Sequence, residues 1–585
     1  MASTLALHCG GESTSVHEKH ASGAAGAISG RGGRGNGTSA GRAGAFSSGG
    51  CAPCMAGSGG SGDGGAGVGE GGAPNGGDGD AGAEPGGAGP GGQNEAGSAG
   101  DAARGGSAGS TAGTAAGGRG AAGSGGTAVA GEAGAPAVDG LGIVKVALYQ
   151  AVEIPLMVGG AELPANENAP VMAERDALVR VWVAPGAAFE PRAVAGALTI
   201  TSTAGVRVAK TTKTIAAAST DGDLASSLNF TVRANEMAAT TTVVLDVHET
   251  TGTAESLAHW PATGARVLGA QVSNGPFLVT LVPLIANGVT PDTSETVRSR
   301  FERYLDRVYP ATNVDVSVRG AVTLDATVFA DGTGWDAALE QLLDTRSADA
   351  PAQNVYYYGV LTPGTTFDAY CQSDCVVGLS NVASRTQTQL RGAIGTGYFA
   401  TPKDTFSQET LAHELGHALG RDHSPCGTDD PDPLYPYKDG GIGVYGYDGA
   451  RLLSPSTYTD LMGYCVPVWI SDYTYAHLFD RIAYANGSLP KLASAPRVVE
   501  SPQRLLRLGV DGRLHWGHET YGTPPTDAPT VALDLLDASG HVLSTLTVPF
   551  AGFDHLPGGF LSVPTDALGI DVASVRVLGR TLDVP

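Results

Sequence analysis

The chain has 585 residues and carries 58 acidic against 35 basic side chains, a formal net charge of −23. This acidity argues against nucleic acid and anionic membrane surfaces as partners, and no apolar run is long enough for a transmembrane helix. A chain of this length is expected to fold as several domains rather than one.

The N-terminal quarter of the chain has the composition of a tether. Residues 1–140 hold 47 of the 88 glycines and a single aromatic residue, Phe46. Such a segment cannot bury enough apolar surface to offset the entropy of ordering it. We therefore interpret residues 1–138 as a disordered, low-complexity Gly/Ala-rich tether. The C-x-x-C pair Cys51 and Cys54 within it is open to three interpretations: a local disulfide, a redox or zinc pair, or a latency ligand.

The first residues, "MASTLALHC", leave two interpretations open. The apolar run is short and lacks a basic segment, so it is either the remnant of a lipoprotein signal or an unstructured start. In the first case Cys9 is the candidate lipid acceptor.

We expect an extracellular protein or one held at the outer cell surface. The last four cysteines of the chain lie in one region, and they suit disulfides in an oxidising compartment.

Two segments have the pattern of β domains. Short runs such as "ALVRVWVAP", "GALTITST" and "TTTVVLDVHET" alternate apolar and polar residues and are separated by Gly, Pro, Asn and Asp. They predict a β-sandwich-like domain over residues 139–275. The pattern returns over residues 493–585, which predicts a second β-sandwich-like domain, and the "DASGH" turn within it indicates a hairpin.

The segment 276–492 between them predicts an α/β (α+β) domain. Strand-like runs "FLVTLVPLI", "VDVSVRG" and "NVYYYGVL" alternate with amphipathic helices within 291–310, 334–346 and 471–487. The helical period predicts which side chains face inward: Val297, Phe301, Tyr304, Leu305, Val308, Trp335, Leu339, Leu342, Leu343, Tyr475, Leu478, Phe479 and Ile482.

A fourth predicted helix carries the candidate chemistry. Thr405 and Gln408 form a T-x-x-Q capping box, so the helix is expected to begin there. His413 and His417 are four residues apart and therefore share one face, one turn apart. Glu414 lies beside that face, where it could take a proton from water.

A third histidine follows a glycine. Gly420 allows the left-handed turn that ends a helix, so His423 reaches the same ion from the loop. Three neutral nitrogens with an open fourth position are typical of a catalytic zinc site. The alternative is an ordinary helix with hydrogen-bonded histidines, and the five positions fixed by H-E-x-x-H-x-x-G-x-x-H argue against it.

The stretches "HELGHALGRDH" at 413–423 and "DLMGYC" at 460–465 resemble the metzincin zinc peptidases. The resemblance, to a secreted bacterial type with accessory β domains, implies a metzincin-like catalytic domain holding one Zn²⁺ through His413, His417 and His423. It implies that Met462 is the methionine turn beneath the metal and that Tyr464 ligates zinc or stabilises an oxyanion. It also implies that an edge strand near "AIGTGYFA", residues 393–400, binds substrate, although an ordinary core strand is an equal alternative.

Four cysteines could form disulfides that constrain this segment. Cys426 lies three residues after His423 and Cys465 three after Met462, so a bond between them would tie the two loops together. Cys371 and Cys375 could close a small loop. The sequence does not decide the pairing.

These features predict a zinc endopeptidase acting on extracellular proteins or glycoproteins. Zinc would activate water, Glu414 would be the general base, and Tyr464 would help to stabilise the oxyanion. The alternative is a surface adhesin or glycan-binding protein whose proteolysis is incidental or lost. A peptidase in which a glutamate replaces the third histidine is disfavoured by His423 and Met462.

Two further expectations concern the oligomeric state and calcium. We expect a monomer. The aspartates within 429–439 form either a calcium site, which no other feature of the sequence supports, or a solvated acidic loop.

Overall fold

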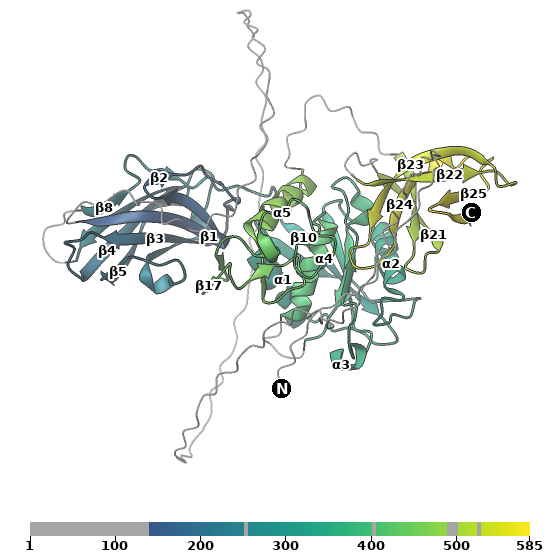
Figure 1. Ribbon diagram of the computed structural model, residues 1–585, viewed down its shortest axis with the longest axis horizontal. Coiled ribbons are helices and arrows are strands. Elements are labelled where there is room, and N and C mark those ends of the chain that lie inside the picture. The colour runs from purple at the N-terminus through teal and green to yellow at the C-terminus, as the bar shows by residue number, and fades with distance from the viewer. Residues whose placement is uncertain (1–139, 251–255, 400–404, 488–500, 523–527) are drawn as a thin grey trace, which may run out of the picture. The chain divides into compact units, whose positions relative to one another are not determined.

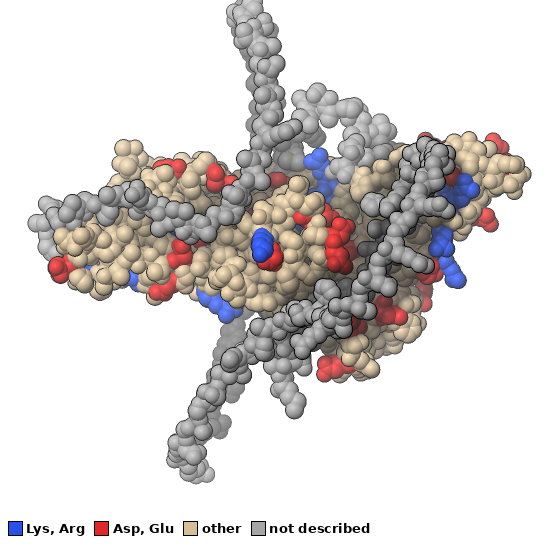
Figure 2. Space-filling view, viewed as in Figure 1, with Lys and Arg blue, Asp and Glu red and all other residues tan. Residues whose placement is uncertain are grey.

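The structure is a computed structural model that describes residues 140–250, 256–399, 405–487, 501–522 and 528–585 (Figure 1). The expectations for the tether, for Cys9 and for Cys51 and Cys54 lie outside these residues. The chain is multidomain and mostly β, with few helices. No described helix is long and apolar enough to cross a membrane. On the face drawn in Figure 2, the Lys and Arg side chains of the described residues are scattered rather than gathered into one basic surface.

The first β segment contains two sheets. One has the order β17-β16-β1-β3-β6, with β2 paired to β1, and the other has the order β5-β4-β7-β8, with β9 paired to β7. The strands are β1 (Leu141–Val158), β2 (Ala161–Glu162), β3 (Ala177–Pro185), β4 (Arg192–Ser202), β5 (Gly205–Ile215), β6 (Leu228–Val232), β7 (Thr242–Glu249), β8 (Ser256–Trp260) and β9 (Arg266–Val267).

The two sheets pack against each other, as the alternating sequence pattern predicts. Along β4 every second residue is buried, namely Val194, Gly196, Leu198 and Ile200, while the residues that alternate with them are less so. A Cβ atom on Gly196 of β4 would lie 2.9 Å from the Phe230 ring of β6, so glycine is what allows the close approach of the sheets. This two-layer arrangement is the one expected for a sandwich.

The first β segment is completed by residues from the middle of the chain. Strands β16 (Gly446–Tyr447) and β17 (Leu452–Leu453) extend its first sheet, with Ala151 opposite Tyr447 and Val152 opposite Gly446. Both strands fall within the segment 276–492, which the sequence predicted to be a separate α/β domain. The pairing is between strands about 300 residues apart, which no local pattern reveals.

The middle segment is built on a mixed sheet of order β11-β10-β13-β15-β14, with β12 paired to β10. All of its pairs are parallel except β14 with β15. Its elements are β10 (Phe277–Ile285), α1 (Glu295–Val308), β11 (Val314–Val318), β12 (Val322–Thr323), α2 (Trp335–Asp349), β13 (Val355–Leu361), α3 (Phe367–Tyr370), β14 (Gly378–Ser380), β15 (Gly392–Thr396), α4 (Phe406–Ala418), β18 (Thr459–Asp460), β19 (Val468–Trp469) and α5 (Asp472–Ala485).

Both faces of this sheet are covered, which explains its continuous apolar strands. Along β13, Tyr356 and Tyr358 belong to the core shared with α1, α4 and α5, whereas Tyr357 and Leu361 belong to the core shared with α2. The inward residues predicted for α1, α2 and α5 are all buried. Those predictions are confirmed because each helix has a single covered face.

The C-terminal segment forms one seven-stranded antiparallel sheet of order β21-β20-β24-β23-β22-β25-β26. Trp516 of β21 donates from its indole nitrogen to the Asp583 carbonyl of β26 at 2.8 Å, so the ends of this path meet and the sheet curls around its own core. Its strands are β20 (Ser501–Leu508), β21 (Leu514–Gly522), β22 (Thr530–Leu536), β23 (Val542–Gly552), β24 (Gly559–Pro564), β25 (Ser574–Val577) and β26 (Arg580–Asp583).

This curled sheet differs from the sandwich-like form expected for a flanking β domain. The predicted hairpin at "DASGH" is confirmed: β22 and β23 are antiparallel neighbours, and Gly540 between them has φ +79°. The domain boundary predicted at residue 493 lies outside the described residues. Phe560 of β24 and Leu505 of β20 are buried in the core that α2 shares, so the C-terminal sheet packs on the α2 face of the mixed sheet.

Candidate metal centre

Helix α4 places two imidazoles side by side. His413 and His417 are buried on the same face, and their Nε2 atoms are 3.1 Å apart. The helix is held against α1 by Tyr309, whose hydroxyl donates to the Ala412 carbonyl at 2.6 Å. The expected four-residue spacing therefore produces the expected juxtaposition.

Helix α4 begins where the sequence predicted, but its N-terminal capping differs from the predicted capping box. Thr405 occupies the N-cap position and α4 begins at Phe406, yet the Thr405 side chain makes no capping hydrogen bond. Its hydroxyl donates instead to the Glu409 carboxylate at 2.6 Å. The capping-box prediction with Gln408 is wrong in this respect, because an acceptor one residue further along the helix binds the threonine hydroxyl.

Gly420 turns the chain so that a third imidazole joins the pair. Its φ is +77°, the left-handed region that favours glycine, and a Cβ atom there would lie 2.8 Å from the Ala383 carbonyl oxygen. The loop then brings His423 Nε2 to 3.1 Å from His417 Nε2. The structure thus brings together the three histidines that the sequence analysis grouped.

Backbone carbonyls orient two of these rings. His413 Nδ1 donates to the Leu461 carbonyl, and His417 Nδ1 donates to the Arg421 carbonyl, each at 2.6 Å. A proton on Nδ1 leaves the lone pair on Nε2, the atom that faces the other rings. Arg421 is itself held by Asp432 at 2.7 Å. Such outer contacts fix the tautomer and orientation of metal-ligating histidines.

Burial keeps the three imidazoles neutral. It lowers the pKa of His413 well below the ordinary value, with neighbouring His417 adding to the effect. Burial also lowers the pKa of His417 to about 4 and depresses the pKa of His423 strongly. Neutral imidazole is the form that ligates a metal, so the site is prepared for one.

Glu414 is buried beside the histidines with little freedom. A Cβ atom on Gly378 of β14 would lie 2.1 Å from its Oε1 atom, so only glycine there leaves room for the carboxylate. Burial raises the pKa of Glu414 well above its ordinary value, and the nearby Asp554 charge adds to this. A carboxyl group with a raised pKa suits the acceptance and later return of a proton.

The loop of Met462 is joined to the loop of His423. Ser424 N donates to the Met462 carbonyl at 3.0 Å, and Tyr464 N donates to the Cys426 carbonyl at 2.9 Å. Between them the disulfide Cys426–Cys465 links the two loops covalently. The second disulfide in the structure is Cys371–Cys375. Of the pairings that the sequence left open, these are the two that form.

Asp460 shapes the turn that carries Met462. Its carboxylate is fully buried and accepts hydrogen bonds from Met462 N at 2.9 Å and Ser471 N at 2.8 Å. Met462 is buried, and its sulfur lies against Gly416 of α4. No sequence pattern singled out Asp460, although a buried carboxylate in a tight turn needs such donors.

Tyr464 points into the site. Its hydroxyl lies 2.6 Å from His423 Nε2 and 2.5 Å from His555 Nδ1. This position allows either role that the resemblance implied, a ligand or a donor to an oxyanion.

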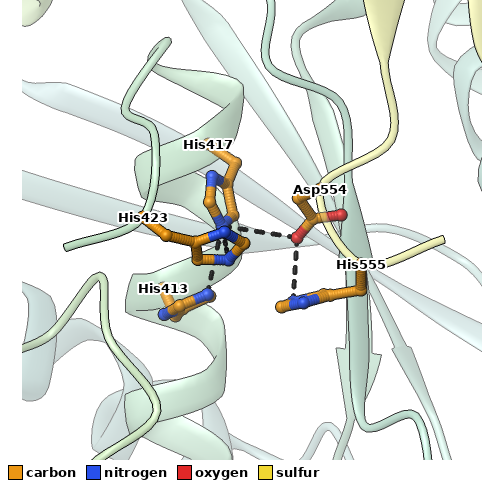
Figure 3. A group of neighbouring side chains, drawn as sticks. All are labelled: His413, His417, His423, Asp554 and His555. Atoms are coloured by element: carbon orange, nitrogen blue, oxygen red, sulfur yellow. Dashed lines mark hydrogen bonds and ion pairs between the residues drawn. The ribbon is translucent and has the colours of Figure 1, made fainter. Parts of the chain in front are cut away.

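Two residues that the sequence analysis missed complete the cluster. Asp554 and His555 lie between β23 and β24 of the C-terminal sheet, and Figure 3 shows them facing the three histidines. Asp554 Oδ2 is 3.4 Å from His417 Nε2 and 2.9 Å from His555 Nε2. The sequence predicted an open position beside the three histidines; in the structure two side chains lie there, because a loop from the C-terminal domain enters the site.

The five side chains fit a metal ion. One donor atom from each of His413, His417, His423, Asp554 and His555 lies within 4.8 Å of all the others. Donors of a tetrahedral ion with bonds of about 2.0–2.1 Å are separated by about 3.3 Å. The 3.1 Å and 3.4 Å separations around His417 Nε2 agree with this, and no comparable cluster occurs elsewhere in the described part of the chain.

The structure bears on two alternatives that the sequence left open. The segment 393–400 contains β15, which lies between β13 and β14 and is not an edge strand; the edge is the short antiparallel β14. In the acidic loop 429–439, the Asp432 carboxylate accepts hydrogen bonds from Arg421 and from the Tyr473 hydroxyl. Asp432 is thus bound by protein donors, while Asp429, Asp430 and Asp439 of the same loop are exposed.

Comparisons with known proteins bear on this site. The model of the family Peptidase M66 matches residues 376–456, a range that contains β14 and the three histidines and ends before Met462. The match indicates a metallopeptidase family. No curated protein matches the chain. Among solved structures, a β-glucuronidase of glycoside hydrolase family 2 aligns at 12% identity with a TM-score of 0.11, over 70% of this chain and 48% of that one; a likeness this weak carries no argument.

Proposed function

We propose that the chain is a zinc-dependent endopeptidase of the metzincin type that hydrolyses peptide bonds in extracellular proteins or glycoproteins. The observation that carries the proposal is the cluster of three neutral imidazoles beside the buried Glu414. The match to a metallopeptidase family over the same residues supports it. The proposal includes secretion or surface tethering, with Cys9 as the candidate anchor, and a monomeric enzyme.

His413, His417 and His423 would hold the ion, and the ion, when bound, would supply the positive charge that polarises the scissile carbonyl. Glu414 takes a proton from the attacking water and passes it to the leaving amine, so that one C–O bond forms and one C–N bond breaks. The Tyr464 hydroxyl donates a hydrogen bond to the oxygen on which charge develops. The carbonyls of Leu461 and Arg421 hold the imidazoles while this happens.

An apolar pocket beside Glu414 suits a peptide side chain. It has a volume of about 80 Å³. Its lining combines catalytic residues with apolar side chains that include Val377, Phe406, Leu461, Val466 and Val468. Polypeptide recognition by such pockets depends on apolar burial next to a few polar groups. We expect a preference for a small apolar residue next to the cleaved bond.

A peptide-library digest, with and without chelator and read by mass spectrometry, tests the proposal. Chelator-sensitive cleavage is expected from the wild-type chain and none from Glu414→Ala, which should still bind zinc. Cleavage by Glu414→Ala at the wild-type rate would refute the mechanism. Binding to mucin in the presence of chelator, without cleavage of any peptide, would favour an adhesin instead.

A further inference from the structure

The segment from Gly552 to His555 lies along the edge of the catalytic sheet as a bound peptide would. Val382 N donates to the Gly552 carbonyl at 3.1 Å, and Asp554 N donates to the Ser380 carbonyl at 3.3 Å. Between these bonds Asn381 and Phe553 form an antiparallel bridge. Strand addition at a sheet edge is a common way to hold an extended peptide. The C-terminal domain therefore occupies the β14 edge itself.

The Asp554 side chain is directed at the metal centre. Its Oδ1 atom accepts a hydrogen bond from Ser380 N at 2.9 Å, while Oδ2 lies at 3.4 Å from His417 Nε2. The side chain is fully buried, and Oδ2 also lies 2.9 Å from His555 Nε2. A buried carboxylate is costly unless positive charge compensates it, and both the His555 imidazole and a metal ion held by the histidines can supply that charge. Its place among the imidazoles is that of a fourth ligand.

His555 covers the two groups that the proposed reaction needs. Its Nε2 atom lies 3.1 Å from Glu414 Oε1, and its Nδ1 atom lies 2.5 Å from the Tyr464 hydroxyl. One carboxylate oxygen of the proton acceptor and the hydroxyl of the oxyanion donor are thus both in contact with His555. The position between Glu414 and the histidines, where water must enter, is filled by the imidazole.

The segment is anchored by its own packing. Phe553 is buried against Phe560, with ring centroids 5.3 Å apart, and Phe553 N donates to the Gly558 carbonyl at 3.1 Å. A Cβ atom on Gly332 would lie 2.7 Å from Leu556, so the far side of the loop is also closely packed. The loop is thus closely packed against the rest of the fold on both sides.

We propose that this segment closes the peptidase site from within: Asp554 is a fourth protein ligand of the metal, His555 covers Glu414 and Tyr464, and a substrate peptide must displace both from the β14 edge. The inference rests on the proposed function and adds a regulation to it. A closed site with four protein ligands is typical of a metal that is not engaged in catalysis, whereas catalysis needs an exchangeable position.

The test uses the full chain loaded with Zn²⁺ or, for spectroscopy, with Co²⁺. Asp554→Asn keeps an acceptor for Ser380 N but is a poor ligand, and His555→Ala uncovers Glu414 without changing the Ser380 contact. His541→Ala, on the exposed β22–β23 turn with its side chain 82% exposed, is the matched control. Two readouts are followed: cleavage of fluorescein-labelled casein, and the affinity of acetohydroxamate from the visible spectrum of the Co²⁺ protein.

If the open form is populated in about one molecule in ten or fewer, both site variants should cleave casein and bind acetohydroxamate about tenfold better or more. His541→Ala should match the wild type in both. An unchanged or weaker acetohydroxamate affinity in a folded variant overturns the proposal, and if Asp554→Asn fails to fold, His555→Ala decides. Tighter acetohydroxamate binding without casein cleavage by any form would retain the closure and reject the peptidase. Casein cleavage by all forms, with an unchanged affinity for acetohydroxamate, would retain the peptidase and reject the closure.

Discussion

Gly416 of α4 lies directly over Met462. A Cβ atom on Gly416 would be 2.4 Å from the Met462 sulfur and 3.0 Å from its methyl group. The glycine falls between His413 and His417 in the H-E-x-x-H stretch, so its missing side chain is what allows the methionine to lie against the helix that carries these histidines. Helix and turn are therefore matched in shape at this point.

Gly416→Ala should destabilise the fold and disturb the site. Overpacking of a well-filled interior typically costs about 1–3 kcal/mol, although alanine itself favours the helix by about 1 kcal/mol. We expect a lower free energy of unfolding in denaturant titrations and weaker zinc binding. Gly320→Ala, where a Cβ atom would meet nothing within 4 Å, is the control. Equal stabilities of Gly416→Ala and wild type would show that Met462 can move aside.

The Cys426–Cys465 disulfide should matter more than Cys371–Cys375. Loop-closure entropy predicts up to about 4 kcal/mol for a separation of 39 residues and about 2 kcal/mol for a separation of 4. Only the longer link joins the loops of His423 and Tyr464. The Cys426→Ser/Cys465→Ser protein should therefore lose stability and zinc affinity, measured by calorimetry and metal titration. Cys371→Ser/Cys375→Ser should retain the metal; equal metal loss in both would contradict this.

Local patterns in the sequence predicted much of the site. His413, Glu414 and His417 belong to one helical turn, so 3.6-residue periodicity alone determines how they lie. Gly420 signals the turn that delivers His423 within six residues of His417. Each of these relationships depends on a few consecutive residues, and the structure reproduces them. The same holds for the buried faces of α1, α2 and α5.

The rest of the site could not be predicted because it depends on contacts between distant segments. His555 lies 141 positions from Glu414, in a loop between two strands of a different domain. An Asp-His pair in such a loop carries no spacing that distinguishes it from any other turn. For residues 393–400 the core strand, one of the two alternatives left open, is the one that forms; the edge strand β14 was not predicted, because its three residues are too few for an alternating pattern.

Metal-free protein should lose stability as the pH falls from about 6.5 to about 4. Burial lowers the pKa of His417 to about 4 in the folded chain, whereas an unfolded imidazole titrates near 6.5. Between these values the unfolded chain binds the extra proton, so the free energy of unfolding rises with pH and levels off above about 6.5. The contribution of His417 is about 3 kcal/mol over this window.

Denaturant titrations at several pH values, after chelation, measure this dependence. His417→Asn should reduce the slope of stability against pH by about one proton between pH 4 and pH 6.5. His541→Asn, at an exposed position, should leave the slope as it is. The same slope in wild type and His417→Asn would mean that His417 is not held neutral by burial.

Tyr464→Phe should separate catalysis from metal binding. The substitution removes only the hydroxyl, which contacts His423 and His555 and leaves the three imidazoles and Glu414 in place. If the hydroxyl stabilises the oxyanion, kcat on labelled casein should fall roughly 100-fold with little change in KM or zinc content. If the hydroxyl is instead a zinc ligand, zinc affinity should fall as well.

Tyr447→Phe is the control and should behave as the wild type, because the Tyr447 hydroxyl donates to the exposed Gly449 carbonyl. An unchanged kcat in Tyr464→Phe would reduce Tyr464 to a packing residue, because neither bond of its hydroxyl would then serve the reaction.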